Sequence, residues 1–259
     1  MVKTISSLQN PFIKQLIQLK EKSKLRKQTG LFIIEGKREL SLAIKGNYTI
    51  ETLYYYVDLF SASEAASLEI YGIDIIEITK TVYEKVAHRG TTEGIVAVAK
   101  AKNFDLNNLK FNSETPLILV AEAPEKPGNI GALLRTAEAA NVDAIIISNP
   151  LTDLYNPNII RSSVGGIFTV SIATGSSEDI ITYLKKQNIF IYAATLQDSV
   201  EYDSVNYKKA TALIVGAESV GLSSIWRDVA TAKIRIPMQG KIDSMNVSVA
   251  AGILVFEAK

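Results

Sequence analysis

A stretch near the middle of the chain brings an amide, a guanidinium and two glycines together in a pattern that could bind an anion or a nucleotide. In PGNIGALLR, which starts at Pro127, Asn129 lies between the glycines at the start of a predicted helix, and Arg135 follows one and a half turns later. Glycine lets a ligand approach the backbone closely, and a helix N-terminus offers unpaired N–H groups to an anion. The same residues also fit an ordinary turn before a helix with a surface arginine.

Two later stretches carry polar side chains at comparable places. Gly216 and Glu218 follow an apolar run, and Ser244 and Asn246 precede the last apolar run of the chain. Ser and Asn are preferred helix N-caps, so a capped helix explains the second pair by itself. Ligands of open parallel sheets bind beyond the carboxyl ends of strands, so loops of this kind are also where a site is expected.

The residue types that are missing exclude many other reactions. The chain has no cysteine and a single histidine, His88. Disulfides, thiolate metal sites and cysteine nucleophiles are therefore excluded, and we expect no metal site. We interpret His88 as a surface or packing residue. The sequence also lacks three glycine-containing motifs, which are the dinucleotide-binding fingerprint, the P-loop and the nucleophile elbow.

Positive charge is concentrated at the start of the chain. Residues 1–40 carry nine Lys or Arg against three Glu, whereas the whole chain has 28 against 27 acidic residues. The densest part is KEKSKLRK at 20–27, which contains Lys22, Lys24, Arg26 and Lys27. Such a run is commonly the solvated face of a helix, and it becomes a candidate phosphate-binding surface only if the substrate is a nucleic acid.

Apolar runs and helical periodicity alternate along the chain, which predicts two α/β units separated by a polar, Asn-rich linker at 102–116. In the first unit we predict helices at 10–27, 37–45 and 62–70, and strands at 31–34, 50–57, 73–78 and 95–99. In the second unit we predict strands at 117–121, 144–148, 168–172, 189–193, 212–215 and 232–236, and helices at 129–140, 157–164, 177–187, 222–229 and 246–258. Strands that are apolar throughout indicate a parallel sheet covered on both faces.

No stretch has the pattern of a membrane span or a signal peptide. The longest apolar run, near residues 250–256, is far shorter than the roughly 20 residues needed to cross a bilayer. The first residues are polar and do not form a signal sequence. We therefore expect a cytoplasmic protein.

Four stretches, in this order, resemble the successive motifs of the TrmH/SpoU family of RNA ribose 2′-O-methyltransferases, which belongs to the SPOUT class. They are PGNIGALLRTAEAANVDAIII, RSSVGGIF at 161–168, ALIVGAESVGLS and IPMQGKIDSMNVSVAAGILVFE. Met245 stands where the family usually has Leu, and we expect this similar-sized apolar residue to leave cofactor binding intact. Ser219 and Val220 replace a more common glycine-containing pair. FIIEGKREL and EGIVAVAK extend the resemblance more loosely to the N-terminal part.

The resemblance implies a fold with two α/β domains. Residues 1–101 would form a small L30e-like RNA-binding domain, 102–116 a linker, and 117–259 a parallel-sheet SPOUT domain. The last segment of the SPOUT domain would pass through a loop to form a deep trefoil knot, which is a rare exception to the rule that chains do not thread themselves. Family members act as homodimers, so we expect a homodimer.

The resemblance also implies S-adenosylmethionine as the cofactor and a ribose 2′-hydroxyl of RNA as the methyl acceptor. Cofactor contacts are expected from Thr195, Gly216, Glu218, Ile236, Met238 and Met245. The reacting centre is expected to contain Arg135, Asn129, Ser244 and Asn246. RNA contacts are expected from Arg161, Lys22, Lys24, Arg26 and Lys27.

Ribose methylation needs alignment of the reacting groups and some way to remove or offset the hydroxyl proton, but it needs neither metal nor thiol. An arginine stays protonated at any relevant pH, so Arg135 is expected to orient the hydroxyl and stabilise its developing charge rather than act as a base. Ribosomal RNA is the expected substrate. A tRNA 2′-O-methyltransferase and a non-catalytic RNA-binding member of the fold are the alternatives.

Overall fold

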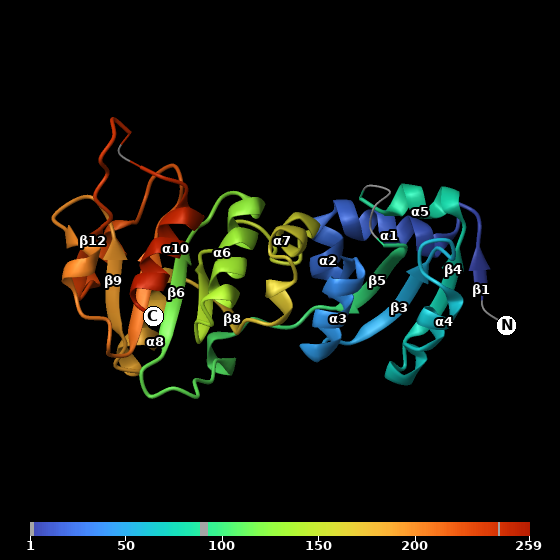
Figure 1. Ribbon diagram of the computed structural model, residues 1–259, viewed down its shortest axis with the longest axis horizontal. Coiled ribbons are helices and arrows are strands. Elements are labelled where there is room, and N and C mark those ends of the chain that lie inside the picture. Colours follow the sequence, from blue (N-terminus) through green and yellow to red (C-terminus); the bar gives the residue numbers. More distant parts are fainter. Residues whose placement is uncertain (1–2, 89–92, 243) are drawn as a thin grey trace. The chain divides into compact units, whose positions relative to one another are not determined.

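The chain folds into two compact units, and each unit is built from two separate stretches of the sequence. The computed structural model describes residues 3–88, 93–242 and 244–259 (Figure 1). The first unit contains the residues up to Lys102 together with Asp153–Thr169, and the second contains Asn103–Thr152 and Val170–Lys259. The compact units and the domains predicted from the motifs therefore divide the chain differently at Asp153–Thr169.

The first unit contains a five-stranded mixed sheet with the strand order β1-β4-β3-β5-β2. Its strands are β1 (Lys3–Ile5), β2 (Leu31–Glu35), β3 (Ile50–Tyr55), β4 (Asp74–Ile78) and β5 (Ile95–Lys100). β5 runs antiparallel to both of its neighbours, β2 and β3, while β4 is parallel to β3 and to β1. The sequence predicted four of these strands and missed β1, which has only three residues.

Helices pack against this sheet through apolar faces. They are α1 (Pro11–Glu21), α2 (Ser23–Thr29), α3 (Lys37–Lys45), α4 (Ala62–Ala66), α5 (Lys80–Val86) and α7 (Pro157–Ser162), with 3-10 turns η1 (Glu69–Tyr71) and η3 (Gly166–Phe168). Ile13, Leu16 and Leu19 of α1 recur at helical spacing and are buried in the same cluster as Val82 and Tyr83 of α5. The apolar stripe predicted for the first helix is thus its core face.

The predicted helix at 10–27 is two helices. Asn10 caps α1, because its side chain accepts a hydrogen bond from the Phe12 N–H and Pro11 occupies the first turn. Lys22 then adopts an extended conformation, with φ −111° and ψ 104°, which ends α1 before α2 begins. The break turns the side chain of Arg26 into the protein, where it is buried.

The second unit contains a seven-stranded sheet in which every neighbouring pair is parallel, with the order β10-β12-β9-β11-β6-β7-β8. The strands are β6 (Leu117–Glu122), β7 (Ala144–Ser148), β8 (Ile172–Gly175), β9 (Phe190–Ala194), β10 (Val200–Glu201), β11 (Thr211–Val215) and β12 (Ala232–Arg235). All residues of β6, β7 and β11 are buried. The central strands are therefore covered on both faces, as their continuous apolar sequences predicted.

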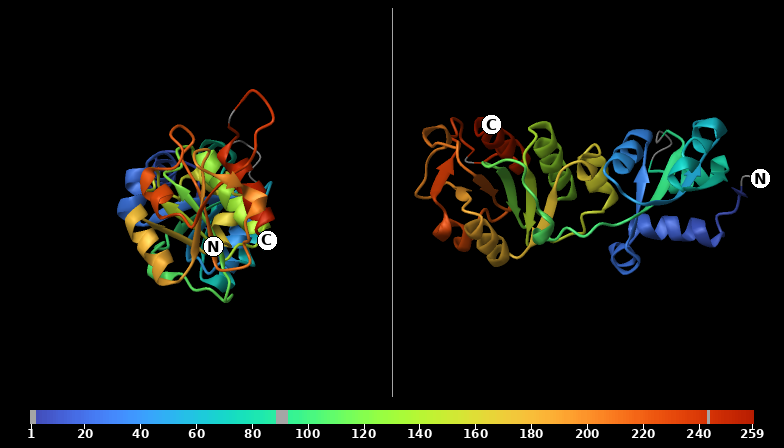
Figure 2. Two further views of the ribbon diagram at one scale, coloured as in Figure 1. Left: turned by 90° about the vertical axis from the view of Figure 1, so that its left-hand side faces the viewer. Right: turned by 90° about the horizontal axis from the view of Figure 1, so that it is seen from below.

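Helices cover the two faces of this sheet. They are α6 (Pro127–Ala139), α8 (Ser177–Lys186), α9 (Ser224–Val229) and α10 (Val247–Glu257), and the 3-10 turn η2 (Leu106–Asn108) lies in the predicted linker. α6 and α10 pack together on one face, and α8 and α9 lie on the other (Figure 2, right). A cluster that includes Ile118, Ile146 and Trp226 fills the space beneath α8 and α9. Leu106 and Leu109 of the linker pack against this cluster.

The strand predicted at 168–172 is wrong. Phe168 ends the 3-10 turn η3, and its ring packs edge-on against Tyr48 with centroids 5.1 Å apart. Gly165 has φ +87°, a left-handed conformation that lets the chain turn sharply before η3. The apolar residues of this stretch therefore serve the core of the first unit, and β8 begins only at Ile172.

Among the described residues, no helix is both long enough and apolar enough to cross a membrane. The most apolar helix, α10, has eleven residues.

Candidate active site

Four neighbouring strands end beside one another, and each leads into a segment that carries predicted site residues. β12, β9, β11 and β6 are adjacent and parallel, so their carboxyl ends share one edge of the sheet. β6 leads to α6, β9 to Thr195, β11 to Gly216 and β12 to Ile236. The segments that follow β11 and β12 extend beyond this edge (Figure 1).

The carboxylate of Glu218 binds the start of α6. Its Oε2 accepts a hydrogen bond from the Glu125 N–H at 3.1 Å, and its Oε1 accepts one from the side-chain amide of Asn129. Unpaired N–H groups and the helix dipole favour a negative charge at a helix N-terminus. The loop after β11 is thereby tied to the first turn of α6.

Asn129 connects this carboxylate to the last helix. Its Oδ1 accepts a hydrogen bond from Nδ2 of Asn246 at 3.1 Å. Oδ1 of Asn246 in turn accepts from the N–H of Ser248 at 2.9 Å and from its hydroxyl at 2.6 Å, which caps α10. Glu218, Asn129 and Asn246, which lie far apart in the sequence, thus form one hydrogen-bonded network, called here the amide network.

The amide network keeps the carboxyl of Glu218 ionised. Burial by itself raises the pKa of this group, but hydrogen bonds from the Asn129 side chain and from backbone N–H groups, including those of Glu125 and Lys126, outweigh burial and lower the pKa below its ordinary value. Hydrogen bonds to a charged group are worth roughly 1.5–3 kcal/mol each, less where solvent screens them. A charged Glu218 is therefore part of the resting site.

The loop after β11 is closed tightly on itself. Ala217 and Gly221 form a β-bridge, and the Gly221 N–H donates to the Ala217 carbonyl at 2.9 Å. A Cβ atom on Gly216 would lie 2.2 Å from the Gly221 carbonyl carbon and 2.3 Å from the Leu222 nitrogen. Only glycine fits at position 216 while the loop keeps this shape, and φ +68° at Gly221 also favours glycine.

Arg135 is exposed on α6, and its guanidinium forms no hydrogen bond or ion pair with another described residue. A guanidinium carries five N–H donors in a fixed fork that suits phosphate or a developing oxyanion. Within the described part of the chain, no other side chain occupies these donors.

The six residues predicted to bind the cofactor share one property. Thr195, Gly216, Glu218, Ile236, Met238 and Met245 are all half-buried, whereas Ser244 and Asn246 are exposed. The Thr195 N–H donates to the Ile234 carbonyl at 2.9 Å, which continues the sheet beyond β9. Half-buried apolar and polar groups around the carboxyl edge of a sheet suit a ligand with both kinds of surface.

A buried carboxylate that the sequence reasoning missed supports these loops. Glu122, at the end of β6, is 6% exposed and accepts hydrogen bonds from the N–H of Ser223 at 2.8 Å, from its hydroxyl at 2.6 Å and from the hydroxyl of Ser177 at 3.2 Å. The Trp226 indole N–H donates to the same Ser177 oxygen at 3.0 Å. The signal was a glutamate closing an otherwise apolar strand.

One of the predicted RNA contacts is wrong. Arg26 is 5% exposed and forms an ion pair with Asp153, with Nη2 2.6 Å from Oδ2 and Nε 3.2 Å from both carboxylate oxygens. Its Nη1 donates to the Leu19 carbonyl at 2.6 Å. A buried and saturated guanidinium cannot reach a phosphate. Lys22, Lys24 and Lys27 are exposed, and an RNA contact at each of them stays a prediction.

Arg161, another predicted RNA contact, lies on α7 and belongs to the first unit, whereas the residues of the amide network belong to the second. It is exposed, and its Nη2 donates to Oδ1 of Asn158 at 2.8 Å.

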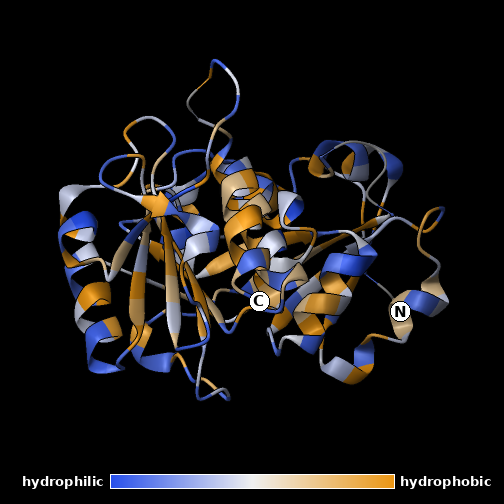
Figure 3. Cartoon of the chain, turned by 60° about the vertical axis from the view of Figure 1, so that its left-hand side comes forward, coloured by the Kyte–Doolittle hydropathy of each residue, from blue (hydrophilic) through white to orange (hydrophobic). Residues whose placement is uncertain are grey.

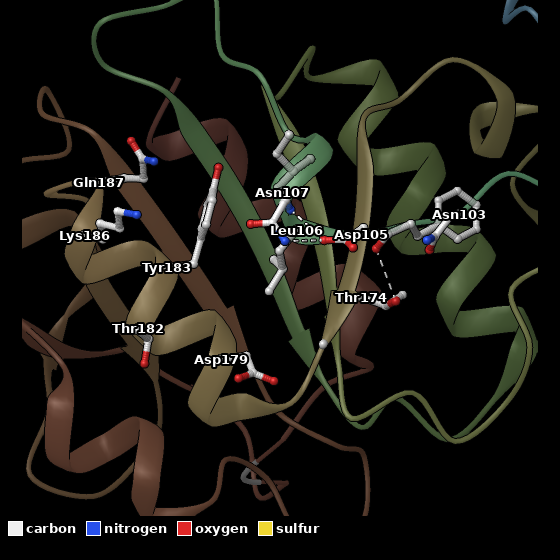
Figure 4. A pocket seen from close by; sticks show the side chains of 13 residues that line it. Asn103, Asp105, Leu106, Asn107, Thr174, Asp179, Thr182, Tyr183, Lys186 and Gln187 are labelled. Atoms are coloured by element: carbon white, nitrogen blue, oxygen red, sulfur yellow. Dashed lines mark hydrogen bonds between the residues drawn. The ribbon is translucent and has the colours of Figure 1, made fainter.

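A separate hollow of about 600 Å³ lies between the linker and α8. Figure 4 shows Asn107 and Leu106 on one side of it and Tyr183 and Lys186 on the other. The Thr174 hydroxyl donates to the Phe104 carbonyl at 3.3 Å, which holds the linker against β8. None of the predicted site residues lines this hollow.

The chain matches two family profiles. The SpoU rRNA Methylase family matches residues 116–256, and an MRM3-like substrate binding domain matches residues 10–97. The crystal structure of an AdoMet-bound rRNA methyltransferase from Sinorhizobium meliloti superposes with a TM-score of 0.91 at 30% identity, covering 99% of this chain and 97% of that one.

Relatives with names of their own include two bacterial enzymes. The 23S rRNA (guanosine(2553)-2′-O)-methyltransferase RlmP of Bacillus subtilis (strain 168) is 26% identical over 258 residues, with 100% of both chains covered. The 23S rRNA (guanosine-2′-O-)-methyltransferase RlmB of Vibrio parahaemolyticus is 32% identical over 197 residues, covering 74% of this chain and 79% of that protein. Because the first profile spans more than half of the sequence, the chain belongs to the SpoU rRNA methylase family, as its motifs predicted.

Proposed function

We propose that the protein transfers a methyl group from S-adenosylmethionine to a ribose 2′-hydroxyl of ribosomal RNA. The observation that carries this proposal is the amide network at the shared carboxyl edge of four parallel strands. Arg135 lies on α6, the helix that carries Asn129 of the network, and its guanidinium pairs with none of the described residues. Relatives named as 23S rRNA 2′-O-methyltransferases support the substrate class.

The residues around this edge suit S-adenosylmethionine. We assign Ile236, Met238 and Met245 to its apolar surface, Thr195 to its polar groups, and Gly216 to a stretch of backbone that it passes closely. When bound, the cofactor supplies an electrophilic methyl group on a positively charged sulfur. The negative charge of Glu218, held ionised by its hydrogen bonds, favours a cationic ligand at this edge of the sheet.

Arg135 is assigned to the acceptor hydroxyl. The 2′-oxygen becomes more negative as its proton leaves. A guanidinium that has no hydrogen-bond or ion-pair partner among the described residues can stabilise that charge without breaking any interaction seen there. Arginine does not give up its proton at physiological pH, so the hydroxyl proton passes to water or to a neighbouring phosphate rather than to this side chain.

Asn129 acts mainly as a positioning residue. Its amide donates one hydrogen bond to Glu218, and its carbonyl oxygen accepts one from Asn246, so half of its hydrogen-bonding capacity holds the site together. One amide N–H and one lone pair remain for RNA. Ser244 and Asn246 are assigned to the same centre, where Asn246 both caps α10 and closes the network.

We assign RNA binding to exposed basic residues of the first unit, Lys22, Lys24, Lys27 and Arg161. Each phosphate neutralised by such a residue releases counterions, which makes the affinity depend on salt concentration. The profile match over residues 10–97 supports a substrate-binding role for this part of the chain.

We further propose that the protein is a cytoplasmic homodimer that contacts its partner through α10. This helix is apolar almost all round (Figure 3), and Val249 and Phe256 are 54% and 60% exposed. Exposed apolar side chains on one helix are typical of an interface between chains. The cytoplasmic location is proposed because ribosomal RNA, the proposed substrate, is found there. Light scattering of the wild type and of Phe256→Glu tests the dimer, because a monomeric wild type contradicts it.

We also propose that the chain after β12 passes through an earlier loop and forms a trefoil knot. The support is the path of this segment: it leaves β12, which lies two strands from β11, and α10 then packs against β11 and α6. A crystal structure traced through residues 211–259 tests the threading.

The test of the activity is methyl transfer from radiolabelled S-adenosylmethionine to unmodified ribosomal RNA and to tRNA. We expect label in ribosomal RNA, at a position where the backbone resists alkaline hydrolysis because its 2′-oxygen is blocked. Label only in tRNA favours a tRNA methyltransferase. Cofactor binding without transfer to either RNA favours a non-catalytic RNA-binding protein.

A further inference from the structure

The loop after β9 carries Thr195, one of the residues assigned to the cofactor, and most of this loop is exposed. It consists of residues 195–199, between the end of β9 and the start of β10, and is called here the β9 loop. Leu196, Gln197 and Asp198 are exposed, and Thr195 and Ser199 are half-buried. None of the five side chains is buried in an apolar core, so apolar packing does not fix the shape of the loop.

Hydrogen bonds within the β9 loop form a local turn. Oγ1 of Thr195 accepts from the Gln197 N–H at 3.4 Å, and the Ser199 hydroxyl donates to the Leu196 carbonyl at 3.0 Å. Asp198 adopts a left-handed conformation with φ +48°, which Asp tolerates better than most residues. The bond from the Thr195 N–H to Ile234 connects the first residue of the loop to β12. The bonds of the turn itself do not connect its later residues to the rest of the unit.

Two guanidiniums make that connection. Nη1 of Arg227, on α9, donates to the side-chain carbonyl oxygen of Gln197 at 2.9 Å. Nη1 of Arg235, the last residue of β12, donates to the Ser199 carbonyl. Hydrogen bonds from a charged donor are stronger than those between neutral groups. The β9 loop is thus held at two points, its middle and its end.

Both arginines follow residues that are fully buried. Trp226, directly before Arg227, is 0% exposed, and its indole N–H donates to Ser177. Ile234, directly before Arg235, is also 0% exposed, and its strand pairs with β9. The guanidiniums therefore connect an exposed loop to well-packed parts of the second unit.

The same two arginines join the segments to which cofactor contacts are assigned. α9, which carries Arg227, follows the loop after β11 with Gly216 and Glu218. Arg235 directly precedes Ile236, where the segment after β12 begins. The β9 loop is the third of these segments. Arg227 and Arg235 therefore link it to the other two.

Ordinary surface ion pairs do not explain these contacts. The carboxylate beside Arg235 is that of Glu201, but its Oε1 is 4.0 Å from Nη2, and the two side chains are 37% and 53% exposed. An exposed pair of this kind contributes little. Lys233 approaches the β9 loop in a similar way, with Nζ 4.0 Å from Oδ2 of the exposed Asp198. Lys233 is thus a cation beside the loop that does not hold it closely, which makes it a matched control.

We propose that Arg227 and Arg235 are positioning residues of the cofactor site, which keep the β9 loop closed so that Thr195 is in place before S-adenosylmethionine binds. The inference rests on the proposed function, from which it takes the cofactor contact of Thr195. A loop that already has its binding shape need not be ordered when the ligand arrives, and this preserves affinity. If the released loop has that shape about one tenth of the time, the apparent Kd rises about tenfold.

Isothermal titration calorimetry of the full-length protein with S-adenosylmethionine tests the proposal. Arg227→Ala and Arg235→Ala should each raise the Kd about tenfold, and Lys233→Ala should bind as the wild type does. An unchanged Kd in either arginine variant overturns the proposal.

Hydrogen exchange of the ligand-free protein separates positioning from a general loss of stability. The amides of residues 196–199 should exchange faster in both arginine variants. The unfolding temperature should stay that of the wild type, because an exposed loop can open while the sheet remains folded. A higher Kd that comes with a lower unfolding temperature, or with unchanged exchange in the loop, contradicts the positioning role.

A double-mutant cycle shows whether Arg227 acts through Gln197. Gln197→Ala removes the acceptor and should raise the Kd as much as Arg227→Ala does. The double variant should bind no more weakly than either single variant, because both changes break the same hydrogen bond. Additive increases would mean that the guanidinium contacts the cofactor itself, which contradicts the inference.

Methyl transfer separates this inference from the proposed function. With ribosomal RNA as substrate, both arginine variants should raise the KM for S-adenosylmethionine about tenfold and leave the KM for RNA unchanged. A higher KM for RNA alone would mean that the arginines bind RNA phosphates, which contradicts the inference and not the proposed function. No transfer by the wild type contradicts the proposed function, and cofactor titration and hydrogen exchange then still decide what the two arginines do.

Discussion

Replacing Gly216 by alanine should disable the loop after β11 by steric overlap. The added Cβ would lie 2.2 Å from the Gly221 carbonyl carbon, whereas ordinary contact starts at 3.4 Å, so the two backbone segments must separate by about 1.2 Å. Overpacking of this kind costs roughly 1–3 kcal/mol, and loss of the Gly221–Ala217 hydrogen bond adds about 1 kcal/mol. If the closed loop is needed for S-adenosylmethionine, the affinity falls by about 30-fold to 700-fold.

Isothermal titration calorimetry with S-adenosylmethionine measures this effect. The matched control is Gly240→Ala in the segment after β12, where the nearest atom to an added Cβ is 4.0 Å away. That variant should bind the cofactor as the wild type does. Thermal unfolding of both variants should stay close to that of the wild type, because the loop lies outside the sheet and can open locally. Unchanged affinity in folded Gly216→Ala would refute the assignment of this loop to the cofactor.

Three further predictions concern single side chains. Arg135→Ala should lower methyl transfer by orders of magnitude and leave cofactor affinity nearly intact in calorimetry, because the guanidinium is assigned to the hydroxyl. Arg26→Ala should lower the free energy of unfolding in urea by about 3–5 kcal/mol, because it leaves the Asp153 carboxylate buried without its partner; exposed Lys27→Ala is the control. Glu218 has a lowered pKa in the folded protein, so its contribution to stability is complete above the ordinary glutamate pKa of 4.5 and is lost as the pH falls through the lowered value. Thermal unfolding from pH 7 to pH 3 should therefore depend on pH less in Glu218→Gln.

Each of these predictions has an outcome that would contradict it. Equal losses of turnover and cofactor affinity in Arg135→Ala would mean that the side chain binds the cofactor. An unchanged free energy of unfolding in Arg26→Ala would mean that the ion pair with Asp153 does not stabilise the fold. Parallel pH curves for the wild type and Glu218→Gln would mean that Glu218 is not held ionised by the amide network.

The alternation of strands and helices and the parallel sheet could be predicted because a strand that is buried on both faces has a continuous apolar sequence. The strands at Leu117–Glu122 and Ala144–Ser148 are buried at every position, and this leaves an unbroken apolar run in the sequence. An apolar run also led to the wrong strand predicted at 168–172. Its apolar stretch is buried by the first unit and not by a strand, and periodicity cannot tell which partner covers a buried residue.

The members of the candidate site could be named from their types and motif order, but their partners could not. Glu218 and Asn129 are separated by 89 residues, and the hydrogen bond between them depends on β6 and β11 being neighbours in the sheet. Arg26 illustrates the opposite error. One extended residue, Lys22, changes the direction of the following helix, so a residue counted in a basic surface is buried in an ion pair.

The central claim is that Arg135 and the amide network together serve ribose methylation. Single-turnover methyl transfer from S-adenosylmethionine to unmodified ribosomal RNA, with the product mapped by resistance to alkaline hydrolysis, tests it most directly. The account predicts one resistant ribose with the wild type and none with Arg135→Ala at saturating cofactor. Methylation of a base, or an unchanged rate in Arg135→Ala, would contradict it.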